Sequence, residues 1–561
     1  MNSKAILHIP ESPFACYLGN GRFLLRLRVD KGDRGVDAYV HYGAKYPFTE
    51  KRDIASMHIS YEDGDFAYLD AIVELNDRRL AYVFELREGE KRQFYSEKGL
   101  IGEYDFHVSY RDFFQFPYVY DQPSTPGWVK DAVFYQIFPD RLKMGDKGKD
   151  KGYINLKWGD KPKPTSFAGG DLKGIIESIP YLNELGVNAI YLTPIFLSKS
   201  YHKYDTIDYM RIDPQLGDEK DLINLIHAAH KSGIRIMLDA VFNHVSKESI
   251  YFKDAIANGK DSYYWDWFFV KGDSIDVDEP NYEYFSVCPY MPKLNGDCPS
   301  CYEYLLGVCL HYLKLGIDGW RLDVADEVSH RLWKRMSEDI KLRYPESIMV
   351  AEHWHNPNRF LEDGIDGAMN YPITYAIEDY IAKKEIDAAG AASRINRIYA
   401  NLYPSKIDGM FNLLESHDTF RFLTLCGGDV DRYRQALALL FFLPGMSCIY
   451  YGTEIPMEGG YDPDSRRCFP QEGFECQSDQ FRFLQKLISL RKQPPMAGGD
   501  FRCYEEDGML VVERTKGGEG LRLMLNATSA PKPCRGEFLL ESKKENDELL
   551  PSGFIIRRIK R

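Results

Sequence analysis

The feature that most constrains the fold is a unit that recurs between residues 130 and 450. In each copy, a segment with helical apolar spacing ends at a glycine and a short apolar run follows. Residues 172–185 end at Gly186, and the pattern returns at Gly233 and again at Gly316. A glycine that ends a helix just before a buried strand is typical of βα units in a parallel sheet.

Eight candidate strands can be counted in this part of the chain, near residues 133, 189, 236, 320, 349, 367, 411 and 448. Eight such units predict an α/β fold built on a (β/α)8 barrel rather than an open doubly wound sheet. No GxGxxG motif follows the first strand, which disfavours a dinucleotide-binding sheet. A long aromatic-rich segment follows the third strand, and it predicts an inserted subdomain over residues 243–300.

The segments on either side of the barrel have the alternation of β-strands. Apolar and polar residues alternate in 23–29, which is typical of a sandwich with one solvated face, and we expect an N-terminal β-sandwich over 1–122. The proline-rich stretch 121–127 predicts a boundary. The catalytic barrel is then expected over 127–496, and a small C-terminal β domain over 497–561.

The net charge limits the classes of partner, and the cysteine content indicates the cellular compartment. The formal net charge is −13, which argues against nucleic acid and anionic membranes but not against a neutral sugar. No apolar run is long enough to span a membrane, and the first residues lack the pattern of a secretory signal. With eleven scattered cysteines, an odd number, the sequence predicts a cytoplasmic protein with reduced thiols.

Charged residues interrupt three of the apolar runs at the same relative place. Asp323, Glu352 and Asp418 each follow a candidate strand. The carboxyl ends of barrel strands meet at one face, so these three side chains should converge. Glycoside hydrolysis requires such a set, because one carboxylate attacks the anomeric carbon and another protonates the departing oxygen. A single Asp at a strand end could instead cap a helix, but three at consistent positions favour catalysis.

The residues around these carboxylates predict different protonation states for them. Arg321 lies two residues before Asp323, so both side chains share one face of the strand. We therefore expect the guanidinium to keep Asp323 ionised. The neighbouring charges of Asp323 and Asp418 should raise the pKa of Glu352, as a general acid requires.

Four runs together resemble the conserved regions of glycoside hydrolase family 13, the α-amylase family: DAVFNH (239–244), GWRLDVADE (319–327), AEHW (351–354) and LLESHD (413–418). The resemblance implies that Asp323 is the nucleophile, Glu352 the general acid/base and Asp418 a third carboxylate that holds sugar hydroxyls. It also implies that the substrate is bound by Asp239, Arg321, His244, His417, Tyr204, His202, Asp462 and Arg466.

The run MPKLN at 291–295 is similar to one in the neopullulanase, cyclomaltodextrinase and maltogenic amylase subgroup. This implies hydrolysis of α-1,4-glucosidic bonds in cyclomaltodextrins and short malto-oligosaccharides, with pullulan as a further substrate and some transglycosylation. Trp354 and Phe285 would then be sugar platforms on the leaving-group side. The subgroup also implies a carbohydrate-binding-like N-terminal domain through which two copies form a homodimer.

Two alternatives stay open from the sequence. An exo-acting α-glucosidase or oligo-1,6-glucosidase would share the fold and the three carboxylates. A non-catalytic sugar-binding relative would require the loss of one of those carboxylates, and all three are present.

The family resemblance also raises the question of a metal, because relatives bind calcium in a loop after the first barrel strand. Three aspartates remain as candidate ligands here, Asp146, Asp150 and Asp171, but Met144 and Lys149 stand at positions where asparagine is expected. A hard cation prefers oxygen ligands and is repelled by an ammonium group. The sequence therefore predicts no calcium and no other cofactor.

Overall fold

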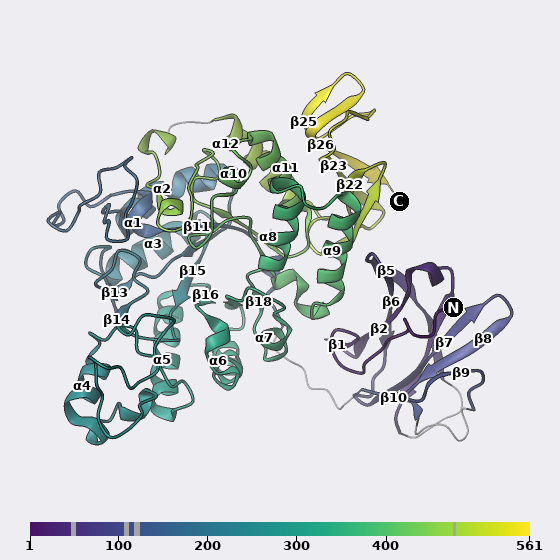
Figure 1. Cartoon of the computed structure of the whole chain (residues 1–561), viewed down its shortest axis with the longest axis horizontal. Coiled ribbons are helices and arrows are strands. Elements are labelled where there is room, and N and C mark those ends of the chain that lie inside the picture. Colours follow the sequence, from purple (N-terminus) through teal and green to yellow (C-terminus); the bar gives the residue numbers. More distant parts are fainter. Residues whose placement is uncertain (47–51, 106–111, 117–123, 475–477, 561) are drawn as a thin grey trace. The chain divides into compact units, whose positions relative to one another are not determined.

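The computed structural model describes residues 1–46, 52–105, 112–116, 124–474 and 478–560. The chain forms two compact units (Figure 1). One contains Met1–Ser124, Lys384–Ile407 and Asp500–Arg561, and the other contains Thr125–Lys383 and Asp408–Gly499. The predicted boundary stretch 121–127 lies partly outside the described residues, and the domain boundaries stay predictions.

An eight-stranded parallel sheet forms the centre of the second unit. Its order is β18-β17-β16-β15-β12-β11-β20-β19, and a parallel bridge between Met369 and Phe411 joins its two ends. The predicted (β/α)8 barrel is thereby confirmed. Its strands lie at the eight predicted places: β11 (Val133–Ile137), β12 (Ala189–Leu192), β15 (Arg235–Ala240), β16 (Gly319–Leu322), β17 (Ile348–Ala351), β18 (Gly367–Ala368), β19 (Phe411–Asn412) and β20 (Met446–Tyr450).

Helices connect these strands, and the predicted glycines end two of them. Gly186 and Gly316 adopt φ values of 97° and 110°, which favour glycine because it has no Cβ. None of the helices in the described part of the chain is both long and apolar enough to span a bilayer. The helices of this unit are α1 (Pro139–Leu142), α2 (Leu172–Leu185), α3 (Glu219–Lys231), α4 (Ile250–Asn258), α5 (Pro299–Leu315), α6 (His330–Arg343), α7 (Asn358–Glu362), α8 (Tyr371–Ile377), α10 (Phe422–Leu425), α11 (Val430–Phe442) and α12 (Asp479–Arg491).

Two inserted segments extend from the carboxyl-terminal end of the barrel strands. The hairpin of β13 (Phe196–Ser198) and β14 (Thr206–Ile212) follows β12. The predicted subdomain follows β15, and its aromatic residues form a small core. There, Phe252 of α4 packs against Phe268 and Tyr282, with ring centroids 4.9 Å apart in both pairs. These rings therefore hold the insertion together, and they are not all available to a ligand.

The N-terminal segment of the first unit is the predicted β-sandwich. One sheet has the order β1 (Ala15–Gly19), β2 (Arg22–Asp30), β6 (Phe66–Glu74), β5 (His58–Glu62). The other has the order β4 (Asp53–Ser56), β3 (Asp37–Ala44), β7 (Leu80–Glu88), β8 (Lys91–Ser96), β9 (Gly99–Ile101), and β10 (Phe114–Gln115) pairs with β7. The alternating apolar residues of β2 and β7 pack between the sheets in one buried cluster.

The face of this sandwich that was predicted to be solvated is partly covered. Arg26, a polar position of β2, is 1% exposed and pairs with Asp70 at 2.7 Å. Its guanidinium also donates to the carbonyl oxygen of Ala400, at the end of α9 (Ala388–Ala400). This helix covers part of the face, and local alternation could not predict it because α9 is remote in sequence.

The same helix contacts the C-terminal sheet. The side-chain amide of Asn396 donates to the carbonyl oxygen of Glu62 at 2.7 Å and to that of Cys503 at 2.8 Å. The turns at Asp507-Gly508 and Gly517-Gly518 have positive φ values. The strands of this sheet are β21 (Asp500–Glu506), β22 (Met509–Lys516), β23 (Glu519–Asn526), β24 (Lys532–Pro533), β25 (Leu540–Glu545) and β26 (Glu548–Lys560).

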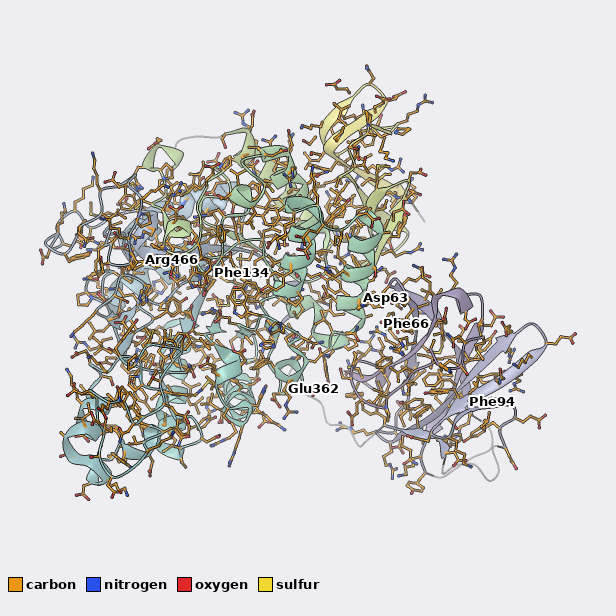
Figure 2. All side chains as sticks on the ribbon, viewed as in Figure 1. Asp63, Phe66, Phe94, Phe134, Glu362 and Arg466 are labelled. Atoms are coloured by element: carbon orange, nitrogen blue, oxygen red, sulfur yellow. The ribbon has the colours of Figure 1, made fainter. Side chains whose placement is uncertain are left out.

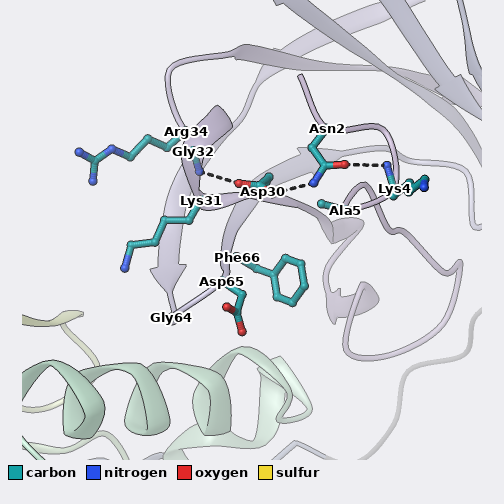
Figure 3. A pocket seen from close by; sticks show the side chains of 10 residues that line it. All are labelled: Asn2, Lys4, Ala5, Asp30, Lys31, Gly32, Arg34, Gly64, Asp65 and Phe66. Carbon is teal, nitrogen blue, oxygen red and sulfur yellow. Dashed lines mark hydrogen bonds between the residues drawn. The ribbon is translucent and has the colours of Figure 1, made fainter.

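A hollow of about 880 Å³ opens on the sandwich, beside Asp30 and Phe66 (Figure 3). Its polar groups are paired with one another: Asn2 donates to Asp30 at 2.8 Å, and the Lys31 ammonium donates to the carbonyl oxygen of Asp63 at 2.9 Å. The Arg28 guanidinium stands 4.0 Å from the centre of the Phe66 ring.

Candidate active site

Three neighbouring strands bring acidic side chains to one end of the barrel. Asp239 of β15 is in register with Arg321 of β16. Asp323 follows β16 directly, and its N–H donates to the carbonyl oxygen of Ala240 at 3.1 Å. Glu352 follows β17 in the same way. Because parallel pairing places equivalent positions side by side, the three carboxylates form one wall of the site.

The guanidinium of Arg321 lies at the centre of this wall and is 1% exposed. Nη1 is 2.6 Å from Oδ1 of Asp323 and 3.0 Å from Oδ1 of Asp239. Nη2 is 2.7 Å from Oε2 of Glu352. A single buried cation therefore contacts all three carboxylates. Nη1 donates charge-assisted hydrogen bonds to Asp239 and Asp323, whereas Nη2 forms only an ion pair with Glu352.

Burial controls the protonation of the two central carboxyls. It raises the pKa of Asp323 well above the usual range, although Arg321 opposes the rise. It also raises the pKa of Glu352, again against Arg321, and the charge of Asp418 adds to that rise. The expected rise at Glu352 is found. Arg321 lowers the pKa of Asp323, as expected of a group that favours the ionised form, but the guanidinium is shared and the removal of Asp323 from water outweighs it.

Asp418 has a different environment on the other side of the site. Its Oδ2 is 3.0 Å from Nε2 of His417, and Oδ1 is 3.1 Å from Nη2 of Arg466. Figure 2 labels Arg466 among the side chains of the second unit. Burial raises the pKa of Asp418, but His417 and Arg466 more than offset it, so the net shift is downward. Nη1 of Arg466 also contacts Asp462 at 2.9 Å and the hydroxyl of Tyr201 at 2.9 Å. Asp418 is therefore an ionised carboxylate.

The hairpin after β12 supplies a further ring beside this group. The hydroxyl of Tyr204 lies 3.1 Å from Oδ2 of Asp239 and 2.5 Å from Nε2 of His417. The Tyr204 and His417 rings are stacked, with an interplanar angle of 4°. His202 lies next to Tyr204, with ring centroids 6.0 Å apart, and burial lowers its pKa to about 4. His202 is therefore a neutral hydrogen-bonding group near neutral pH.

Two aromatic pairs are also associated with the predicted site residues. Phe285 stacks on His244 with centroids 4.8 Å apart, and burial lowers the pKa of His244 to about 4. Trp354 stacks on the buried Tyr371, with centroids 3.8 Å apart and an angle of 8°. Tyr371 thus fixes the orientation of the Trp354 ring, as expected for an aromatic platform.

Two family models match the chain. The model described as the alpha amylase catalytic domain matches residues 136–482, and the alpha amylase N-terminal ig-like domain matches residues 1–120. The chain belongs to the α-amylase family. It is therefore a glycoside hydrolase.

Its relatives in this family match along most of their length. The chain is 39% identical to a cyclomaltodextrinase of Thermoanaerobacter pseudethanolicus, over 94% of this chain and 93% of that protein. It is 38% identical to an intracellular maltogenic amylase of Bacillus subtilis, over 88% of this chain and 85% of the relative. A solved cyclomaltodextrinase structure superposes with a TM-score of 0.90 at 33% identity, covering 100% of this chain and 98% of the other.

Sequence reasoning missed two polar side chains that belong to the α-amylase site. Nε2 of Gln136 donates to Nδ1 of His417 at 2.7 Å, which leaves Nε2 of the imidazole to carry the proton. The hydroxyl of Tyr191 donates to Oδ2 of Asp239 at 2.6 Å. The only signal for Gln136 is its polarity within the apolar run of β11, and Tyr191 has none, because it reads as an ordinary strand residue.

His353, which follows Glu352 in the sequence, is directed to other partners. Its Nδ1 lies 3.4 Å from Oδ2 of Asp326, and its ring centroid lies 5.2 Å from that of Phe360. The side chain therefore packs between the loop after β16 and α7.

The loop after β11 does not fit the calcium ion that the family implies. Nζ of Lys149 lies 2.9 Å from Oδ2 of Asp171, 2.6 Å from the carbonyl oxygen of Gly169 and 3.0 Å from that of Gln215. These oxygens are the kind of donors a hard cation needs, and an ammonium group already contacts them. A second cation at this place would be repelled.

The other two candidate ligands are also engaged. Asp146 pairs with Lys173 at 2.7 Å, and Asp150 accepts from the N–H of Gly152 at 2.8 Å. Within the described residues, no three His, Cys, Asp or Glu side chains are grouped as a metal site.

Proposed function

We propose that this α-amylase-family hydrolase cleaves α-1,4-glucosidic bonds of cyclomaltodextrins and short malto-oligosaccharides with retention, using Asp323, Glu352 and Asp418. The observation that carries the proposal is Arg321, whose two terminal nitrogens contact Asp323 and Glu352. Two carboxyls that share one guanidinium lie near each other, which is compatible with double displacement, in which the two groups are about 5–5.5 Å apart.

In the first step, Glu352 donates its proton to the glycosidic oxygen while a carboxylate oxygen of Asp323 attacks the anomeric carbon. The C–O bond breaks, the leaving chain departs as an alcohol, and the glucosyl residue becomes an ester of Asp323. In the second step, the Glu352 carboxylate removes a proton from water, whose oxygen attacks the same carbon and expels Asp323. Two inversions give net retention.

The remaining groups bind the sugar around this centre. Ionised Asp418, with His417 and Arg466, faces the positive charge that develops at the anomeric carbon and accepts hydrogen bonds from sugar hydroxyls. Tyr204, Asp239 and the neutral imidazoles of His202 and His244 offer further hydrogen bonds and an aromatic face. On the leaving-group side we place Trp354 and Phe285, and at the non-reducing end Asp462 with Arg466.

A digest of β-cyclodextrin followed by proton NMR tests the proposal. Ring opening should give linear malto-oligosaccharides, and the first new reducing-end signal should be that of the α-anomer. Pullulan and maltotriose, digested in parallel, rank the substrates. Glucose as the sole product from linear substrates, with the cyclodextrin ring untouched, would instead support an exo-acting α-glucosidase or oligo-1,6-glucosidase. A β-anomer appearing first would contradict retention.

We further propose that the protein is a homodimer formed through residues 1–122, as its subgroup resemblance implies. Light scattering of the full chain should give about twice the monomer mass of 64.8 kDa. A mass of 64.8 kDa at all protein concentrations would contradict the proposal. A chain that begins at residue 124 is the matched control, since it should stay monomeric.

A cytoplasmic location completes the proposal. One relative is named an intracellular maltogenic amylase. Several cysteines in the described part of the chain are buried free thiols, among them Cys16, Cys301 and Cys309. Such thiols persist in a reducing compartment.

A further inference from the structure

We propose that Lys203 is a positioning residue for this reaction and that, together with Lys149, it forms a metal-free brace behind the sugar-binding hairpin. The lysine brace consists of Lys149, Lys203, Asp171, Asp213 and Gln215. The inference rests on the proposed function, because it concerns how His202 and Tyr204 reach their places at the sugar.

Lys203 has an unusual backbone and a fully buried charge. Its φ is 65°, in the left-handed region that disfavours residues with a Cβ. The side chain is 2% exposed, and Nζ lies 2.9 Å from Oδ2 of Asp213 and 2.6 Å from Oε1 of Gln215. A strained backbone at a functional site persists only where its surroundings hold it. The buried ion pair is such a restraint.

The two neighbours of Lys203 are the sugar-binding candidates of the hairpin. His202 precedes it, and Tyr204 follows it with its hydroxyl in contact with Asp239 and His417. The backbone at residue 203 therefore sets the direction in which both side chains leave the hairpin. In the part of the chain that the structure describes, the polar contacts of the Lys203 ammonium are with Asp213 and Gln215 only. Lys203 therefore acts on the sugar through His202 and Tyr204.

Gln215 joins Lys203 to the second ammonium. Its side-chain oxygen accepts from Lys203, and its carbonyl oxygen accepts from Lys149 at 3.0 Å. Oδ2 of Asp213 also accepts from the N–H of Ser198, at the end of β13. The hairpin is thereby fixed at its first strand, at its tip and at the segment that follows β14.

Lys149 connects this assembly to the loop after β11. Its partner Asp171 is 1% exposed and also accepts from the N–H groups of Gly145 at 2.9 Å and Gly174 at 2.8 Å, the latter at the start of α2. Each ammonium is thus balanced by one buried carboxylate and by uncharged oxygens. The two ammonium groups supply the positive charge that these carboxylate and carbonyl oxygens require. The hairpin should therefore not depend on calcium.

The first test replaces the buried ammonium and leaves the catalytic groups unchanged. Lys203→Met should lower kcat/KM for β-cyclodextrin at least about tenfold, because a displacement of the sugar-binding groups by about 1 Å can cost more than that. Lys203→Arg, which keeps the charge, should recover part of the loss. Lys173→Met removes an exposed ammonium that is paired with Asp146, and it should stay within about twofold of wild type.

A double-mutant cycle separates positioning from general loss of stability. If Lys203 acts through Tyr204, the cost of Lys203→Met should shrink to about threefold or less in a Tyr204→Phe background. Equal costs in both backgrounds would overturn the positioning role, and so would near-wild-type activity of Lys203→Met. Should Lys203→Met fail to fold, Gln215→Leu removes the same acceptor while keeping the carbonyl oxygen, and it must show the same non-additivity.

The metal-free brace is tested without any substrate. The wild-type melting temperature should be the same in excess EDTA and in millimolar calcium chloride, within about 1 °C. A clear rise with calcium, or a fall with EDTA, would overturn the brace. If wild-type protein leaves β-cyclodextrin and maltotriose intact, the proposed function fails, whereas the melting comparison still decides the brace.

Discussion

Replacing Asp323 with asparagine is expected to lower kcat on β-cyclodextrin by at least about three orders of magnitude, a size typical of a lost nucleophile. The amide has nearly the shape of the carboxylate and can keep a contact with Arg321, but it cannot attack the anomeric carbon. Because the buried carboxyl is costly to ionise, its replacement should not lower the melting temperature. The measurements are steady-state kcat and thermal unfolding.

Asp326→Asn is the matched control for this variant. Asp326 lies in the same loop, three residues further on, and its side chain is 45% exposed beside His353. Its activity should stay within about threefold of wild type, as for most exposed substitutions. Near-native kcat in Asp323→Asn would defeat the assignment of the nucleophile.

Replacing Glu352 with glutamine should have the second largest effect, and one that depends on the leaving group. With β-cyclodextrin, kcat/KM should fall by about 10²–10⁴, the usual contribution of a general acid. With α-maltosyl fluoride the leaving group needs no proton, so the first step should lose about tenfold or less. Stopped-flow release of fluoride measures that step. Equal losses on both substrates would contradict the general-acid role.

The pH profile gives an independent check on Glu352. Burial raises the pKa of this carboxyl, so its proton is kept to a higher pH than in a free glutamate. Activity requires the protonated form and should fall as the pH rises through the raised pKa of the Asp323–Glu352 pair. With β-cyclodextrin, this alkaline limb should be missing from the residual activity of Glu352→Gln and should persist in the control Glu327→Gln, whose exposed side chain lies beyond the nucleophile.

Most of the barrel and the three catalytic candidates could be predicted because their signals are local. An apolar run that follows a glycine predicts a buried strand. The first polar residue after the run predicts where that strand ends. Asp323 and Glu352 occupy that place, whereas Asp418 lies further on, after Glu415 in the loop that follows β19. The sheet brings them together because parallel strands end at one face. The absence of calcium stays a prediction, which the sequence makes through Lys149, a lysine at a position where asparagine is expected.

Other features depend on contacts between remote segments. The burial of Arg26 requires α9, and the shared guanidinium of Arg321 requires β15 and β17 on either side of β16. The brace requires that Gln215 stand between Lys149 and Lys203. Periodicity indicates only which side of an element is apolar, and a motif indicates only which chemistry is present. Neither predicts a contact between residues that are far apart in the sequence.

The sequence by itself thus determined the barrel, the β domains that flank it and the carboxylates at the strand ends. Only the tertiary structure decided which cation contacts which carboxylate, and in which direction burial and neighbouring charges shift the pKa values of Asp323, Glu352 and Asp418. The physical reason is that electrostatic energies depend on distance and burial, and both are set by residues far apart in the chain.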